Sequence, residues 1–113
     1  MSKILVVEDD IDQLNLRRLM LEQAGYEVAA AQTAAEALPQ LSGCQVVLMD
    51  LRLPKPEDGM ELIRAASGLA RIVVLSGAES EIAMTVDEFL TKPCSSKRLL
   101  EAVARLCAPA AGQ

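Results

Sequence analysis

The chain has 113 residues and a mass of 12.1 kDa, which is the length of one domain. Hydrophobic residues make up 51% of it and aromatic residues 2%, so we expect a globular protein with an aliphatic core. The net charge of −5 and the shortage of aromatic residues argue against direct nucleic-acid binding, and the absence of histidine excludes Ser/His and Cys/His nucleophile pairs, histidine-ligated zinc and a histidine phosphocarrier.

The cysteines and the chain start indicate the compartment. Three cysteines without a CxxC spacing, Cys44, Cys94 and Cys107, favour a reducing environment over a disulfide framework or a zinc cluster. The first apolar run is too short for a signal peptide, and no later segment is long enough to cross a membrane. These features predict a cytoplasmic protein without membrane contact.

The first strand and helix are predicted at the start of the chain. The apolar run Ile4–Val7 predicts a strand. Asp10 and Gln13 resemble a capping box that opens a helix through about Gln23, which Gly25 ends. The apolar side of this helix is predicted to comprise Leu14, Leu16, Leu19, Met20 and Leu21.

The next segments repeat this alternation. Val28–Ala31 predicts a weaker second strand, and Thr33–Glu36 is a capping box that opens a short helix. Pro39 is expected to kink or end that helix. Val46–Met49 predicts a third strand, and Asp58–Glu61 is read as a third capping box, before another helix.

The last part of the domain contains two more strands and a helix. Ile72–Leu75 predicts the fourth strand and Phe89–Thr91 the fifth. Ser95 or Ser96 is expected to cap the final helix, and residues 108–113 are expected to form a flexible tail after a domain of residues 1–107. The buried stripe of that helix is predicted to be Leu99, Leu100, Val103 and Leu106.

Five strand–helix units predict an α/β fold. The runs are almost continuously apolar, which is typical of parallel strands covered on both faces. Right-handed crossovers then give a doubly wound, flavodoxin-like sheet, for which we expect the strand order 2-1-3-4-5.

Polar residues follow the predicted strands where ligands bind in such sheets, at the carboxyl ends of the strands. The proposed order makes the acids after the first strand neighbours of the acid that ends the third. The residues delivered to this edge are Glu8, Asp9, Asp10, Asp50, Ser76 and Lys92.

This set favours phosphoryl chemistry on a metal ion. Clustered carboxylates repel one another unless a cation joins them, and oxygen ligands suit Mg²⁺. An aspartate can act as a nucleophile and form an aspartyl phosphate, while a lysine and a hydroxyl neutralise the phosphoryl oxygens. Taken singly, each residue also has an ordinary structural explanation: Asp10 as a helix cap, Ser76 in a turn, Lys92 on the surface. Asp50 is the hardest to explain in this way, because a carboxylate at the end of a central strand needs a partner.

The motifs resemble the receiver domain of two-component response regulators, the CheY-like superfamily. The resemblance covers nearly the whole chain. It is carried by Lys3–Asp10, Val46–Pro54, Leu75–Gly77 and Phe89–Pro93.

The resemblance implies a role for each matching residue. Asp50 matches the phosphoacceptor, Ser76 the switch hydroxyl and Lys92 the lysine that contacts the phosphoryl group, with a Lys–Pro bond that is usually cis. Glu8, Asp9, Asp50 and the backbone carbonyl of Arg52 match the Mg²⁺ ligands. Phe89 matches the aromatic switch position, and Arg52 and Ala78 match the positions that tune dephosphorylation.

Partners also follow from the resemblance. A histidine kinase or phosphotransfer protein would dock on the first helix, including Ile11, Leu14 and Arg17. Output to a downstream protein or fused domain would use the face formed by the fifth strand and its two flanking helices. The protein would be a phosphoacceptor with slow autodephosphorylation, not a turnover enzyme, and a monomer or weak dimer.

The chain departs from the family pattern in several places, including the two loops that border the site. The loop Arg52–Asp58 is one residue longer than usual. The interval from Ser76 to Lys92 is shorter, which reduces the helix expected before the fifth strand to about Ser80–Met84, or makes it irregular. This leaves a degenerate receiver, acting as a constitutive interaction module, as the alternative. A phosphohydrolase is disfavoured because Arg52 stands where such an enzyme needs an acid.

Overall fold

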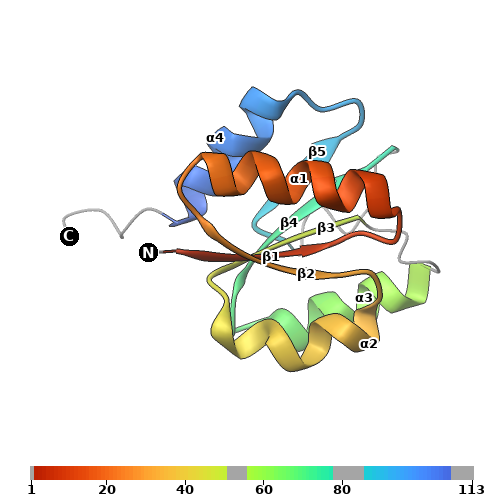
Figure 1. Ribbon diagram of the computed structural model, residues 1–113. Coiled ribbons are helices and arrows are strands. Elements are labelled where there is room, and N and C mark those ends of the chain that lie inside the picture. Colours follow the sequence, from red (N-terminus) through yellow and green to blue (C-terminus); the bar gives the residue numbers. More distant parts are fainter. Residues whose placement is uncertain (1, 51–55, 78–85, 108–113) are drawn as a thin grey trace.

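The computed structural model describes residues 2–50, 56–77 and 86–107. Its centre is a single sheet of parallel strands in the order β2-β1-β3-β4-β5, so the predicted fold and strand order are confirmed (Figure 1). The strands are β1 (Lys3–Val7), β2 (Glu27–Ala31), β3 (Val46–Asp50), β4 (Arg71–Ser76) and β5 (Glu88–Thr91).

Helices cover both faces of this sheet (Figure 1). Helices α1 (Ile11–Gln23) and α4 (Ser96–Cys107) lie on one face, and α2 (Ala34–Ala37), the 3₁₀ helix η1 (Leu38–Gly43) and α3 (Pro56–Ala66) lie on the other. Because successive side chains of a strand point to opposite faces, each apolar run supplies both halves of the core. In β3, for example, Val46 and Leu48 pack with α1 and α4, while Val47 and Met49 pack with the other helices.

Helix α1 begins as predicted. Asp10 is its N-cap, and the carboxylate accepts hydrogen bonds from the backbone N–H groups of Asp12 (2.9 Å) and Gln13 (3.1 Å). Gly25 follows the helix with a φ of 101°, a value that favours glycine. The structural explanation of Asp10 therefore holds.

The apolar side of α1 is narrower than predicted. Leu14 and Leu21 are buried, but Leu16 and Leu19 have 60% and 54% of their surface exposed. These residues do not all share one face of the helix, so Leu14 and Leu21, spaced by seven, are buried, and Met20 packs against the core while partly exposed.

Replacing Asp10 with alanine is expected to lower the free energy of unfolding by about 1 kcal/mol, because two backbone donors of α1 lose their acceptor. The measurement is urea unfolding followed by circular dichroism. Asp12→Ala is the control, because Asp12 is an acid in the same first turn whose backbone, not its carboxylate, takes part in the cap. Equal losses in the two variants would contradict the capping role.

Proline shapes the second helical segment. Thr33 caps α2 through its hydroxyl, which accepts from the N–H of Glu36 at 3.1 Å. Helix α2 ends at Ala37, and the chain continues as η1, with Pro39 in its first turn. The prediction that Pro39 ends the α-helix is confirmed, and the short helix is extended by a 3₁₀ turn.

The start of α3 differs from the prediction. The helix begins at Pro56, so Asp58 lies inside it and the capping box assigned to Asp58–Glu61 is wrong. Proline is well suited to the first helical position, because its fixed φ is helical and its missing N–H has no partner there. In α4 the cap is Ser95, whose hydroxyl accepts from the N–H of Arg98 at 3.1 Å. The helix expected at Ser80–Met84 and the tail 108–113 lie outside the described residues.

The edge strand β5 is joined to β4 at its start as well as along its length. The Asp87 N–H donates to the Ile72 carbonyl at 3.1 Å, and the Asp87 carboxylate accepts from the Ile72 N–H at 2.8 Å. Arg71 adds an ion pair to the same carboxylate at 3.6 Å. None of the helices in the described ranges is long and apolar enough to cross a membrane.

Candidate functional site

The strand register places the predicted site residues together. Val7 of β1 is level with Met49 of β3, so Glu8 and Asp50 follow side by side at the carboxyl ends of these central strands. Ser76, the last residue of β4, is level with Thr91 of β5. The Lys92 N–H donates to the Ser76 carbonyl at 2.7 Å, which fixes the start of the loop that carries the lysine.

Asp50 is a buried carboxylate with a cation beside it. The residue is 7% exposed, and the ammonium group of Lys92 forms an ion pair with Asp50 Oδ2. The alternation along β3 directs Asp50 to the same face as Leu48, beneath α1 and α4. The peptide bond between Lys92 and Pro93 is cis, as the resemblance implied. Asp50 is therefore the partnered strand-end acid that its sequence position predicted.

Glu8 is more buried than Asp50, with 3% of its surface exposed. Its Oε2 accepts from the Asp10 N–H at 3.2 Å, and its Oε1 accepts from Nη1 of Arg17. Burial raises the pKa of Glu8 above its ordinary value, and Asp9 and Asp50 also raise it. The Asp10 hydrogen bond and the charge of Arg17 act in the opposite direction.

Arg17 takes part in the described site in a role that the sequence did not indicate. It was predicted to face a docking partner, but its side chain is only 12% exposed and points to Glu8. Leu14, predicted for the same docking surface, is 4% exposed and belongs to the core. Ile11, at 49% exposed, remains on the surface of α1 as expected.

The acids offer oxygen donors to a divalent cation. Glu8 and Asp50 are buried neighbours at the ends of β1 and β3, and Asp9 is the exposed residue that follows Glu8. Within residues 2–50, 56–77 and 86–107, no three acidic or cysteine side chains form a ready cage for a metal ion. Mg²⁺ does not require one, because it keeps several waters and uses one or two carboxylates. The donor set therefore fits Mg²⁺, with Asp9, Asp50 and Glu8 as the side chains that would hold it.

Of the remaining predicted residues, Ser76 and Phe89 lie within the part of the chain that the structure describes. Ser76 is 7% exposed and ends β4 next to the Lys92 loop, as expected. Phe89 is half-buried and packs, with Val86, against the core cluster on the α2 and α3 face. Its proposed switching role stays a prediction. Arg52 and Ala78 lie outside the described residues.

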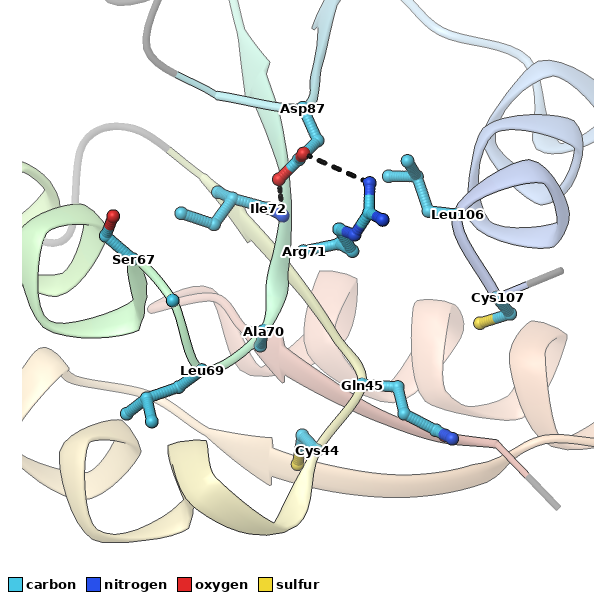
Figure 2. Close-up of a pocket in the computed structure, with 11 residues that line it drawn as sticks. Cys44, Gln45, Ser67, Leu69, Ala70, Arg71, Ile72, Asp87, Leu106 and Cys107 are labelled. Atoms are coloured by element: carbon cyan, nitrogen blue, oxygen red, sulfur yellow. Dashed lines mark hydrogen bonds and ion pairs between the residues drawn. The ribbon is translucent and has the colours of Figure 1, made fainter. Parts of the chain in front are cut away.

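A cavity lies at the opposite end of the sheet from the acids of the candidate site. It measures about 560 Å³ and is lined by residues at the starts of β3 and β4 and the end of α4, including Cys44, Arg71, Asp87 and Cys107 (Figure 2). Burial raises the pKa values of both thiols above their ordinary values, which disfavours the reactive thiolate form. None of the residues proposed for phosphoryl chemistry lines this cavity. The candidate phosphoryl site therefore lies at the other end of the sheet from this cavity.

Comparisons with known proteins identify the family of the chain. The chain matches the response regulator receiver domain over residues 4–104. It is 30% identical to the transcriptional regulatory protein CpxR homolog of Haemophilus influenzae, over 88% of this chain and 48% of that protein. It is 34% identical to the alginate biosynthesis transcriptional regulatory protein AlgB of Pseudomonas aeruginosa, over 92% of this chain and 25% of that protein. The chain thus spans about half or less of the length of these curated relatives.

Two solved structures share this fold over most of the chain. The response regulator receiver domain protein (CheY-like) from Methanospirillum hungatei superposes with a TM-score of 0.83 at 29% identity, covering 93% of this chain and 92% of that one. The receiver protein from Sinorhizobium medicae gives 0.81 at 29% identity, with 93% of each chain covered. The strand order, the acids at the carboxyl ends of the central strands and these matches together show that the chain belongs to the response regulator receiver domain family.

Proposed function

We propose that this domain is a phosphorylation-dependent switch in which Asp50 accepts a phosphoryl group from a histidine kinase or phosphotransfer protein. The observation that carries the proposal is the pairing of the buried Asp50 with Lys92, beside a second buried acid, Glu8. An acid in this setting is held in one orientation and is supplied with positive charge where a phosphoryl group would arrive.

Each residue has a separate task in the proposed transfer. A carboxylate oxygen of Asp50 attacks the phosphorus atom, a new P–O bond forms, and the bond to the donor breaks with its electrons leaving on the donor atom. Lys92 then exchanges its ion pair with Asp50 for contact with a phosphoryl oxygen, and the Ser76 hydroxyl donates to another. Bound Mg²⁺ would supply further positive charge to the phosphoryl oxygens.

Two surfaces next to this site are the expected contacts for partner proteins. A kinase or phosphotransfer protein would contact α1, where Ile11, Leu16 and Leu19 are exposed. A downstream partner or fused domain would contact the edge formed by β5 and α4. The full-length relatives are transcriptional regulators by name, so the output of a longer protein containing this domain is proposed to be transcriptional.

The test is to incubate the domain with Mg²⁺ and a small phosphodonor and to record its intact mass. We expect an increase of about 80 Da, one phosphoryl group, that is lost in base because an acyl phosphate hydrolyses there. Asp50→Asn is expected to abolish it. Asp12→Asn, the same change at an exposed aspartate of α1, is expected to leave it intact. An adduct that persists in Asp50→Asn, or no adduct from any donor or kinase, would refute the proposal. The second outcome would favour the degenerate receiver.

A further inference from the structure

Arg17 is a charged residue on the buried side of a helix. It follows Leu14 by three positions and precedes Leu21 by four. Leu14 and Leu21 are the buried residues of α1. Residues at this spacing share one face, so the stem of Arg17 lies between two core leucines. Arginine keeps its charge in proteins, and a charge in this position needs a counter-charge.

Glu8 provides that counter-charge from nine residues away. Arg17 Nη1 donates to Glu8 Oε1, with the side chains 12% and 3% exposed. Of the ion pairs formed by the described residues, this one is the most buried. The other Glu8 oxygen accepts from the Asp10 N–H, so the chain itself engages both oxygens of this carboxylate.

The two buried acids of the site are thus each neutralised by a cation of the chain. Asp50 pairs with Lys92, as the proposed phosphoryl transfer requires, whereas Arg17 has no task in that transfer. We propose that Arg17 competes with Mg²⁺ for Glu8, so that it lowers the metal affinity of the site and releases Glu8 when the metal binds. The inference rests on the proposed function, because it takes Glu8, Asp9 and Asp50 as the residues that hold the metal.

Charge and space both support this competition. Among the described residues, Arg17 pairs with Glu8 and Lys92 pairs with Asp50, so removing Arg17 takes one positive charge away from the acids of the site. A divalent cation is attracted more strongly to the more negative site. Arg17 and Lys92 also line a cavity of about 110 Å³ between α1 and the start of α4, bordered by Gln13 and Ser96. We expect the displaced guanidinium to turn into this space, which its own side chain already borders.

The first experiment measures metal affinity in a matched pair of variants. Arg17→Met removes the charge and keeps an unbranched stem between the leucines. Arg18→Met removes the same charge from the next residue, which is 50% exposed and pairs with Glu22 on the surface. Mn²⁺ is titrated and the free ion counted by electron paramagnetic resonance, and Mg²⁺ is measured by displacement. We expect Arg17→Met to bind Mg²⁺ about tenfold more tightly than the unaltered protein, and Arg18→Met to differ by less than about twofold.

A second neutral variant and a measurement on the unaltered protein guard against misfolding. Arg17→Gln retains a hydrogen-bond donor without the charge, and it should also bind Mg²⁺ more tightly. In the unaltered domain, side-chain ¹⁵N NMR should show the Arg17 guanidinium protected from water exchange without metal. Saturating Mg²⁺ should move that signal and remove the protection, and the Arg18 signal should stay in place.

The outcomes separate this inference from the proposed function. Unchanged or weaker Mg²⁺ binding in both neutral Arg17 variants would overturn the competition and leave the phosphorylation site intact. An Arg17 signal that ignores Mg²⁺ would overturn it equally. If neither the unaltered protein nor the variants bind Mg²⁺, the proposed metal site itself fails and the inference fails with it.

Discussion

Replacing Lys92 with methionine is expected to slow the phosphorylation of Asp50 by a factor on the order of 100, the usual cost of removing one charge-stabilising donor from a reacting oxyanion. Lys92 pairs with Asp50 Oδ2, so its ammonium group lies where phosphoryl charge would develop. The lysine side chain is 38% exposed, so the variant leaves no cavity in the core. The measurement is the initial rate of phosphoryl adduct formation with a small donor at saturating Mg²⁺.

Lys3→Met is the matched control for this prediction. Lys3 forms an ion pair with Glu27 at 3.5 Å, and its side chain is 39% exposed, close to the value for Lys92. It lies at the other end of the sheet, at the start of β1. The control should phosphorylate at the rate of the unaltered protein. If the two variants slow the reaction equally, the effect comes from net charge, and Lys92 has no local role.

Leu48→Ala is expected to cost about 3 kcal/mol of unfolding free energy, within the range measured when a fully buried leucine is truncated. Leu48 is 0% exposed in the central strand β3, level with Val6 of β1 and Val73 of β4. Sheet neighbours on both sides and helices above prevent the site from collapsing around the lost atoms. Domains of this size commonly have only about 5–15 kcal/mol of total stability, so the loss is a large part of it.

Urea unfolding of Leu48→Ala and Leu19→Ala tests this prediction. Leu19 is 54% exposed on α1, and its truncation should change the unfolding free energy by less than about 0.5 kcal/mol. Similar losses in the two variants would contradict the packing role of Leu48.

The strands and their order could be predicted because both follow from local sequence. In β1 and β3, four consecutive apolar residues predict a buried parallel strand. The preference for right-handed crossovers then limits the possible orders of the strands in the sheet. Asp50 could be predicted because it interrupts such a run at its end. Once the order was fixed, Glu8 and Asp50 had to be neighbours.

The errors have a common physical cause, which is that the local sequence offers more than one possible helix start and more than one apolar helix side. Asp58 followed by Glu61 reads as a cap, but Pro56 fits the first turn of a helix better and α3 starts there. Leu16 and Leu19 read as core residues because α1 has apolar residues on most of its sides. Only contact with the sheet decides which side is buried.

The Arg17–Glu8 pair could not be predicted, because no sequence rule links a helix residue to an acid that precedes the helix cap. An arginine between Leu14 and Leu21 is commonly solvated, with its stem along the surface. The pair depends on how far α1 lies over the end of β1, which is a property of the assembled layers. The same is true of the cavity that Arg17 and Lys92 share.

The hydrogen bonds of Asp87 have a consequence for how such a domain can diverge. They attach the residue before β5 directly to Ile72 of β4, so the register of the edge strand is set by bonds between β4 and the last residue of the β4–β5 connection. A change in the length of that connection then costs little more than loop closure, about 0.6 kcal/mol for each doubling. Related domains can therefore differ in the length of the β4–β5 connection and still keep the pairing of Ser76 with the Lys92 loop. The short connection in this chain is compatible with an intact sheet for that reason.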